Sequence, residues 1–308
     1  MSPVSLQSYS RIVQSRQNRR VKELRASFSP GNRNETGQVG IEGEHLLIEA
    51  LRSGIEITAV FVRSGSEDLL SRIGDRIDER IGLNEALVPF VAPELPPEIE
   101  ILELPEDVFA SAVTTESPQG IAALVKPRAF SLAQILAVPH PLIVVAAALQ
   151  DPGNLGTLIR SAEAFGATGL VTLPGTVSPW NAKALRASSG SAFRLPVVPT
   201  TEAELFPKLN QSRMQILAAV AGHGQSAIST DFTQPTAILI GNEGRGLSPE
   251  LIAAATARVT IPCPGPVESL NAAIAASILL YEASRQRSER LTGTHQPSIQ
   301  ERELKRQS

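Results

Sequence analysis

Three segments in the second half of the chain combine glycines with polar side chains in a pattern that suits ligand chemistry. They are DPGNLGTLIR at 151–160, GNEGRG at 241–246 and IPCPGPVESLN at 261–271. Each follows an apolar run typical of a buried parallel strand, and ligands bind at the carboxyl ends of such strands. Glycines at these ends leave backbone amides and carbonyls open to a flat ligand. We therefore expect the three segments to converge on one site.

The first segment offers an amide and a guanidinium. Asn154 can cap the helix that follows, and Arg160 then lies away from its buried stripe, since successive residues turn by about 100°. Gly156, one turn before Arg160, leaves the guanidinium accessible. Taken alone, an N-cap and a surface charge explain these residues better than catalysis does.

The other two segments are equally ambiguous by themselves. Glu243 can accept hydrogen bonds from loop amides, and Ser269 or Asn271 can cap the next helix while Leu270 packs in the core. However, three polar caps and three glycine-bearing loops at the strand ends of one domain exceed what folding requires. The set as a whole indicates a functional site.

The glycine order in GNEGRG distinguishes this loop from two common nucleotide-binding loops. A Walker A loop ends in Gly-Lys-Ser/Thr, and a dinucleotide fingerprint has the spacing G-x-G-x-x-G. The loop matches neither pattern. A nicotinamide oxidoreductase is therefore excluded on glycine spacing.

The composition describes a two-domain protein without metal or membrane signals. The chain has 308 residues, 42% of them hydrophobic, and a formal net charge of -3, which argues against a protein that coats nucleic acid over its whole surface. The lone Cys263 suits a reducing compartment, so we expect a cytoplasmic protein. The four histidines lack metal-ligand spacing, and no apolar run approaches the ~18 residues of a membrane span.

The first half of the chain predicts an α/β domain over residues 1–126. A basic helix is expected at 11–28, where it suits either a solvated surface or phosphate contact. Its candidate RNA-binding residues are Arg16, Arg19, Arg20 and Lys22. Strands are expected at 38–42, 57–62, 88–91, 98–104 and 120–125, with helices at 44–52 and 67–80.

A linker at 127–140, with one short apolar helix, separates this domain from a second α/β domain over 141–290. Strands are expected there at 142–148, 169–173, 215–220, 236–240 and 258–261. Helices are expected at 155–165, 180–188, 249–255 and 270–287. Residues 291–308 are polar enough to form a disordered tail.

The segments DPGNLGTLIRSAEAFGA, ILIGNEGRGLSPEL and IPCPGPVESLNAAIAASILLYEA, in this order, resemble the three motifs of the SpoU-type branch of the SPOUT RNA ribose 2'-O-methyltransferases. KALRASSGSAFRLPV at 183–197 resembles the segment between the first two motifs. In the first domain, SRQNRRVKELR and GIEGEHLLIEAL resemble the small ribosomal-protein-like RNA-binding domain often fused to these enzymes. We therefore interpret the acid-free first 22 residues as part of that domain rather than as a transit peptide.

The resemblance implies a second domain with a C-terminal trefoil knot, a homodimer, and S-adenosylmethionine bent into the knotted cleft without a metal. Cofactor contacts are implied at Ile240, Gly241, Gly246, Ile261 and Leu270. Apolar walls and backbone hydrogen bonds suit an adenine, and a sulfonium gains nothing from a cationic neighbour. The sequence departs from the family at Cys263, Pro266 and Ala272, and none of these changes removes a polar group implied in catalysis.

The resemblance also implies roles for the polar residues. The equivalent of Arg160 activates the ribose 2'-hydroxyl with help from the adjacent phosphate, although arginine stays protonated and can instead orient and polarise the hydroxyl. Asn154, Glu243, Ser269 and Asn271 line the reaction centre, and Arg186 and Ser188 lie near the RNA.

We predict an RNA ribose 2'-O-methyltransferase that acts on 23S ribosomal RNA, with transfer RNA as the second substrate class. The alternative of a different class is an RNA-binding protein without activity. The polar residues retained in the three motifs argue against that alternative.

Overall fold

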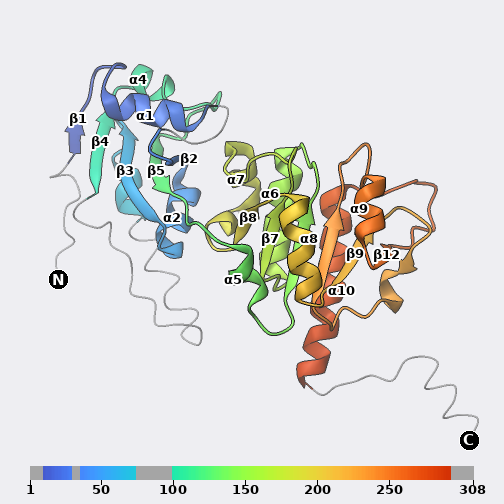
Figure 1. The fold of residues 1–308 in the computed structure, drawn as a ribbon. Coiled ribbons are helices and arrows are strands. Elements are labelled where there is room, and N and C mark those ends of the chain that lie inside the picture. Colours follow the sequence, from blue (N-terminus) through green and yellow to red (C-terminus); the bar gives the residue numbers. More distant parts are fainter. Residues whose placement is uncertain (1–9, 30–34, 74–98, 293–308) are drawn as a thin grey trace, which may run out of the picture. The chain divides into compact units, whose positions relative to one another are not determined.

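The computed structural model describes residues 10–29, 35–73 and 99–292 of the chain, which folds into two compact units (Figure 1). Unit 1 comprises Met1–Phe130, Leu149–Arg160 and Thr176–Val197, and unit 2 comprises Ser131–Ala148, Ser161–Gly175 and Val198–Ser308. The strand predicted at 88–91, the second half of the helix predicted at 67–80 and most of the predicted tail lie outside the described residues.

Unit 1 contains a five-stranded sheet with the order β1-β4-β3-β5-β2. The strands are β1 Ser10–Ile12, β2 Val39–Glu42, β3 Glu56–Arg63, β4 Glu100–Leu104 and β5 Ile121–Lys126. β1, β4 and β3 are parallel to one another, whereas β5 runs antiparallel to both β3 and β2. The described strands lie close to their predicted positions, except that β1 was not expected.

The basic segment is a strand followed by a helix, so the prediction of one helix over 11–28 is wrong. Residues Ser10–Ile12 pair with β4, and helix α1 covers only Arg19–Ser27. The Asn18 side chain accepts a hydrogen bond from the Arg20 amide and thereby starts the helix. Pairing with a strand about 90 residues away overrides local helix propensity, which a local pattern cannot reveal.

Helices α2, α4 and α7 also belong to unit 1. α2 Glu44–Ser53 ends at Gly54, which is left-handed as a helix C-cap requires. α4 Glu106–Ala110 and α1 share one hydrophobic cluster with β3 and β4, centred on Leu24, Phe61 and Phe109. α7 Ala182–Ser188 follows Asn181, whose side chain accepts from the Lys183 amide.

Unit 2 contains a seven-stranded sheet with the order β10-β12-β9-β11-β6-β7-β8. The strands are β6 Leu142–Ala146, β7 Gly169–Thr172, β8 Val197–Pro199, β9 Gln215–Ala219, β10 Gln225–Ser226, β11 Thr236–Ile240 and β12 Ala257–Thr260. All five registered pairs among β6, β7, β9, β10, β11 and β12 are parallel. Strand order reverses beside β6, which has β7 on one side and β11 on the other, and such switch points are where open sheets bind ligands.

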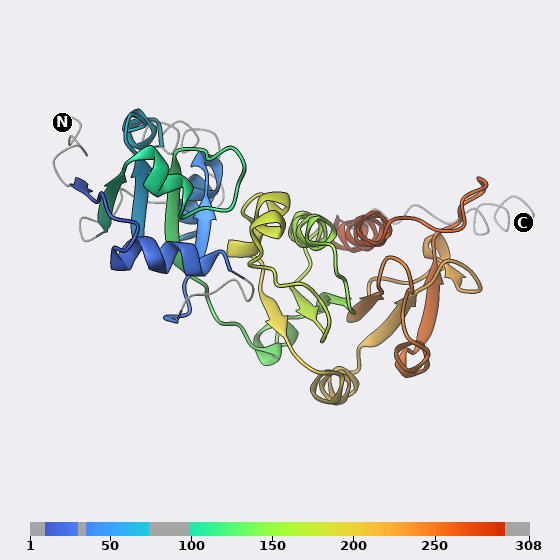
Figure 2. The same ribbon diagram turned by 90° about the horizontal axis from the view of Figure 1, so that it is seen from above.

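Helices cover both faces of this sheet (Figure 2). α10 Ala272–Thr292 lies on one face, whereas α5 Leu132–Leu136, α8 Glu202–Gln211 and α9 Pro249–Ala254 lie on the other. α8 was not predicted, because Pro207 and a polar sequence obscure a helix that Thr201 caps. Helix α6, Pro152–Ala164, begins in unit 1 and ends in unit 2.

The described residues carry neither a membrane signal nor a metal signal. No described helix is long and apolar enough to cross a bilayer. Within the same part of the chain, no three His, Cys, Asp or Glu side chains gather as metal ligands would.

Candidate active site

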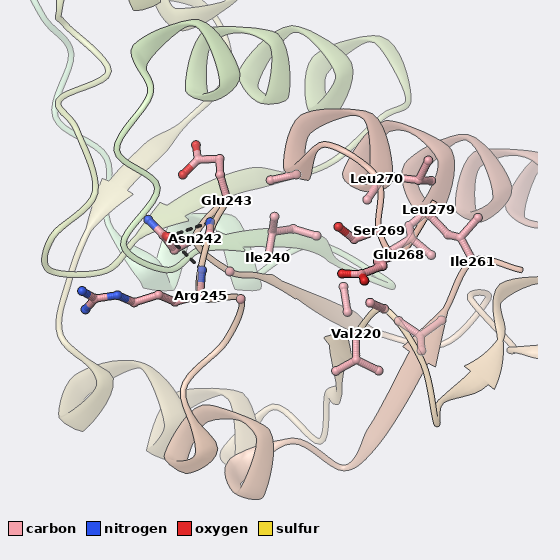
Figure 3. A pocket seen from close by; sticks show the side chains of 18 of the residues that line it. Val220, Ile240, Asn242, Glu243, Arg245, Ile261, Glu268, Ser269, Leu270 and Leu279 are labelled. Atoms are coloured by element: carbon pink, nitrogen blue, oxygen red, sulfur yellow. Dashed lines mark hydrogen bonds between the residues drawn. The ribbon is translucent and has the colours of Figure 1, made fainter. Parts of the chain in front are cut away.

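A cavity of about 330 Å³ lies in unit 2 at the carboxyl ends of β9, β11 and β12, beside the start of α10 (Figure 3). The segments after β11 and β12 meet at one edge of the sheet, as the sequence predicts, together with the segment after β9, which was not expected; segment 151–160 does not line this cavity. The cavity is lined by Ala219, Val220, Ala221, Ile240, Gly241, Asn242, Glu243, Gly244, Arg245, Gly246, Val259, Ile261, Cys263, Glu268, Ser269, Leu270, Ala272, Ala275 and Leu279.

The turn after β11 is closed by its own backbone. The Asn242 amide donates to the Gly246 carbonyl at 3.1 Å, and the Gly246 amide donates back to Asn242 at 2.9 Å. Gly246 has φ +67°, a conformation that glycine adopts without strain. The turn is thus a short, doubly bonded loop at the edge of the cavity.

The Asn242 side chain holds this turn on the sheet, although sequence reasoning gave it no role. Its Oδ1 accepts from the amides of Gly244 at 2.9 Å and Arg245 at 3.2 Å, and its Nδ2 donates to the Ala148 carbonyl at 2.9 Å. Ala148 follows β6, so Asn242 bridges the two strand ends at the topological switch point. The sequence feature that could have predicted this role is an asparagine between the glycines of a turn, because an asparagine side chain there can accept hydrogen bonds from amides two and three residues ahead.

Gly241 is required by a backbone contact. A Cβ at this position would lie 2.2 Å from the Gly246 carbonyl carbon and 2.4 Å from the Leu247 nitrogen. Neither atom belongs to a flexible side chain, so any larger residue must displace the turn. Gly241 therefore contributes only backbone to the cavity wall.

The third segment brings Glu268, Ser269 and Leu270 to the cavity wall. Figure 3 shows the Glu268 carboxylate directed toward the middle of the cavity, whereas the side chains of Glu243 and Arg245 point away from it. Glu268 was not singled out from the sequence.

Asn271 is the N-cap of α10. The sequence allowed either Ser269 or Asn271 in this position. Asn271 Oδ1 accepts from the amides of Ala273 at 3.0 Å and Ile274 at 3.2 Å, and its carbonyl accepts from the Ala275 amide at 2.8 Å. Asn271 is not among the residues that line the cavity. In this structure its side-chain oxygen holds the helix start beside Leu270.

Asp151, not Asn154, caps helix α6, so the prediction for the start of this helix is wrong. Asp151 Oδ1 accepts from the Asn154 amide at 2.8 Å, which places Asn154 inside the first turn. Asp151 Oδ2 also accepts from Lys183 Nζ at 3.0 Å. The hydrogen bond from Lys183, followed by that from the Asn154 amide, holds the pKa of Asp151 below its ordinary value.

Gly156 serves helix packing rather than the accessibility of Arg160. A Cβ at Gly156 would lie 2.3 Å from the Ala184 carbonyl oxygen and 2.6 Å from the Ala187 Cβ, so α7 fills the space above it. The prediction that this glycine opens the surface beside Arg160 is therefore wrong.

Arg160 is nevertheless exposed, and no residue among those described pairs with its guanidinium. Asn154 and Arg160 both belong to unit 1 and do not line the cavity.

The candidate RNA-binding arginines of the first domain are paired with acids, some nearby and some far away in sequence. Arg16 pairs with Asp107 at 2.7 Å, and Arg20 pairs with both Glu23 and Glu100. Arg19 pairs with Glu23 at 2.8 Å, while Lys22 is exposed and has no partner among the described residues. Glu100 of β4 and Asp107 of α4 therefore oppose this basic cluster together with Glu23.

Ser188 and Arg186 differ in what they offer to a ligand. Ser188 is fully buried and donates to the Leu185 carbonyl at 2.9 Å, so its hydroxyl supports α7 and does not reach the surface. The prediction that Ser188 contacts RNA fails on this burial. Arg186 is exposed, and its guanidinium is unpaired within the described part of the chain.

Comparisons with known proteins agree with this geometry. Residues 141–281 match the SpoU rRNA Methylase family, and residues 18–123 match the MRM3-like substrate binding domain. The 23S rRNA (guanosine(2553)-2'-O)-methyltransferase RlmP of Bacillus subtilis is 31% identical over 269 residues, which cover 87% of this chain and 97% of that protein. The chain belongs to the SpoU rRNA methylase family.

Solved structures of other SpoU proteins share the fold of this one. The SpoU methyltransferase AviRb from Streptomyces viridochromogenes in complex with AdoMet matches with a TM-score of 0.73 and 29% identity, covering 88% of this chain and 99% of that one. The AdoMet-bound rRNA methyltransferase from Sinorhizobium meliloti gives a TM-score of 0.73 and 29% identity, covering 90% and 98%. Both sheets and their parallel strands thus follow the SpoU arrangement.

Membership of the SpoU family makes this chain an S-adenosylmethionine-dependent RNA ribose 2'-O-methyltransferase. The cavity fits that cofactor. The residues implied in cofactor binding, Ile240, Gly241, Gly246, Ile261 and Leu270, all line it. The bare strand end at Gly241 supplies backbone groups beside apolar side chains, which together suit an adenine.

Proposed function

We propose that this SpoU enzyme methylates a ribose 2'-hydroxyl in 23S ribosomal RNA. The observation that carries the proposal is the cavity at the ends of β9, β11 and β12, where all five predicted cofactor residues meet. Similarity to RlmP over both domains supports 23S ribosomal RNA as the substrate. Transfer RNA is the competing substrate, and the assay below includes it.

The wall of the cavity suits a cationic methyl donor. S-adenosylmethionine, when bound, supplies a methyl group on a positively charged sulfur. The Glu268 carboxylate points into the cavity and the Arg245 guanidinium points out of it, so the nearest charge inside is negative. Ile240, Ile261 and Leu270 provide apolar contact, and the backbone at Gly241 provides hydrogen-bonding groups.

We assign Arg160 the task of orienting and polarising the 2'-hydroxyl together with the adjacent phosphate. A guanidinium keeps its proton, so it acts here through charge and hydrogen bonds rather than as a general base. Arg160 is exposed on α6 and unpaired within the described residues, which leaves it available to RNA. Asn154, Glu243 and Ser269 complete the proposed reaction centre, and Asn271 contributes by fixing the start of α10.

The proposed RNA surface combines cations without a partner among the described residues and cations that are paired with carboxylates. Lys22 and Arg186 belong to the first class, whereas Arg16, Arg19 and Arg20 must exchange their carboxylate partners for phosphates. Phosphate contacts supply affinity and depend on salt concentration. We assign the first domain, which contains Arg16, Arg19, Arg20 and Lys22, a ribosomal-protein-like fold and the role of substrate binding, supported by the match at 18–123.

We also propose a homodimer, a C-terminal trefoil knot and a cytoplasmic location. α10 exposes Ile274, Ile278 and Tyr281, three apolar side chains on one helix face, and such stripes are typical of interfaces. The knot is assigned to the segments that line the cavity, β11, β12 and the start of α10. The single cysteine is in keeping with a reducing compartment.

The test is methyl transfer to RNA. Purified protein is incubated with methyl-labelled S-adenosylmethionine and either 23S ribosomal RNA or transfer RNA without modifications, and the label is mapped to a nucleotide. We expect label on one ribose of 23S ribosomal RNA and a loss of roughly 10²-fold or more in Arg160→Ala. Label confined to transfer RNA, or an unimpaired Arg160→Ala enzyme, would overturn the substrate or the catalytic assignment respectively.

A further inference from the structure

The buried carboxylate of Glu49 joins the two family-matched regions of the chain within unit 1. Glu49 lies on α2 with its side chain only 11% exposed. Arg194 Nη1 donates to its Oε2 at 2.7 Å, and Arg52 Nη1 donates to its Oε1 at 3.0 Å. Arg52 belongs to α2 itself, whereas Arg194 comes from the methylase region. One carboxylate thus binds an arginine of its own helix and an arginine of the other region.

The turn that precedes Arg194 is seated directly on α2. Gly190 has φ +85°, and a Cβ there would lie 2.5 Å from the Glu49 Cβ and 2.8 Å from its Cγ. Ser189, also left-handed with φ 51°, has its Oγ 2.8 Å from His45 Nε2. Glu49, Arg194, Gly190, Ser189 and His45 form a contact that we call the α2–α7 clamp.

Helix α7 connects this clamp to the helix that carries Arg160. Ser188, the last residue of α7, directly precedes Ser189 of the clamp. The backbone of α7 lies against Gly156 of α6, because a Cβ at Gly156 would be 2.3 Å from the Ala184 carbonyl oxygen. Lys183 Nζ also donates to Asp151 at the start of α6. Arg160 lies one turn beyond Gly156 on the same helix. Contacts this close leave no room for α6 to move independently of α7.

We propose that Glu49 and Arg194 are positioning residues, which fix the substrate-binding domain against α7 so that bound RNA meets Arg160 in one alignment. The proposal rests on the proposed function and adds to it a path from RNA binding to the reacting group. RNA affinity does not depend on the Glu49–Arg194 pair, because surface arginines can bind phosphate without it. The methylation rate does depend on the pair, because displacing the reacting atoms by about 1 Å can lower the rate roughly 10²-fold.

Arg194→Ala and Arg52→Ala provide a matched comparison, since each removes one arginine from the same carboxylate. The intact proteins are compared by single-turnover methylation of 23S ribosomal RNA, by RNA affinity and by S-adenosylmethionine affinity. We expect Arg194→Ala to lower the single-turnover rate by roughly 10- to 100-fold with both affinities within about threefold of wild type. Arg52→Ala should methylate within about threefold of wild type.

Conservative variants separate positioning from stability. Arg194→Lys keeps a cation opposite Glu49 and should recover most of the rate, whereas Arg194→Gln should not. If Arg194→Ala melts below the assay temperature, the Lys and Gln variants make the same comparison. An Arg194→Ala or Arg194→Gln enzyme that methylates at the wild-type rate would overturn the proposal. Absence of RNA methylation by the wild-type protein would instead contradict the proposed function, so the two failures are distinguishable.

Discussion

At the scale of single residues, two glycines that follow strands of unit 2 differ in what surrounds them. A Cβ at Gly241 would meet backbone atoms at 2.2 and 2.4 Å, whereas a Cβ at Gly222 would have no heavy atom within 4 Å. Gly241→Ala must therefore displace the turn that lines the cavity. We expect it to weaken S-adenosylmethionine binding by at least about tenfold, measured by titration calorimetry.

Gly222→Ala is the control for that prediction. Gly222 does not line the cavity, and a Cβ there would have no heavy atom within 4 Å, so the affinity of this variant for S-adenosylmethionine should stay within about twofold of wild type. Equal affinities for the two alanine variants would show that the strand end at Gly241 is not where the cofactor binds.

The sequence identified the residues of the cavity better than it identified their individual roles. Ile240, Gly241, Gly246, Ile261 and Leu270 line it as predicted, because strand ends in a parallel sheet must share an edge. The role of Asn242 depends on a hydrogen bond to Ala148, 94 residues away, and no local spacing contains that information. For the same reason the packing of Gly156 against α7 became visible only in the fold.

At the scale of elements, the start of α6 depends on Asp151. Asp151→Ala removes the cap on the Asn154 amide and should lower the free energy of unfolding by about 1 kcal/mol at pH 7, measured by urea denaturation. Asp151→Asn retains a capping oxygen and should be less destabilising. A loss as large for Asn as for Ala would show that charge, rather than capping, holds this helix start.

The depressed pKa of Asp151 also predicts a pH dependence. The hydrogen bond from Lys183 favours the carboxylate in the folded state, so its contribution is present above the ordinary pKa of 3.8 and is lost as the pH falls through the lower folded value. The difference in melting temperature between wild type and Asp151→Asn should therefore shrink below about pH 4. A difference that stays constant down to acid unfolding would contradict this assignment.

Arg287 bonds helix α10 to several backbone carbonyls of unit 2. Arg287 donates to the carbonyls of His140 at 2.6 Å, Phe232 at 2.8 Å and Gln234 at 2.8 Å. Arg287→Met leaves these acceptors unsatisfied and should cost about 2 kcal/mol of unfolding free energy, measured by urea denaturation.

Arg285 on the same helix is the control for Arg287. It pairs with Glu282 and Glu289 in solvent, and exposed pairs are worth less than about 1 kcal/mol. Arg285→Met should therefore be nearly neutral. If both variants cost the same, the carbonyl contacts of Arg287 do not anchor the helix.

Elements with strong patterns were predicted well, and those that depend on distant partners were not. β11 occupies the predicted residues Thr236–Ile240, because a continuous apolar run bounded by glycine specifies a buried strand. β1 exists only because β4 lies beside it, and β8 and β10 are two or three residues long. Such short edge strands carry no periodicity to detect.

At the scale of the whole molecule, the apolar face of α10 predicts an assembly. Ile274, Ile278 and Tyr281 are 52%, 39% and 57% exposed on one side of the helix. We expect the wild-type protein to be a dimer and Ile278→Glu to be a monomer by size-exclusion chromatography with light scattering, because a charge in an apolar interface is costly. Ile228→Glu, which changes an exposed isoleucine elsewhere, should remain dimeric.

A dimer that survives Ile278→Glu would place the interface on another surface. A wild-type protein that is monomeric at all concentrations would contradict the homodimer outright. Neither result would alter the cavity in unit 2, whose described wall comes from one chain.

A crystal structure with S-adenosylhomocysteine would test the central claim most directly, namely that the ends of β9, β11 and β12 hold the methyl donor. We predict the adenine between Ile240 and Leu270, with the turn at Gly241 against the ligand. Ligand density elsewhere in the molecule, with this cavity filled only by water, would contradict the account.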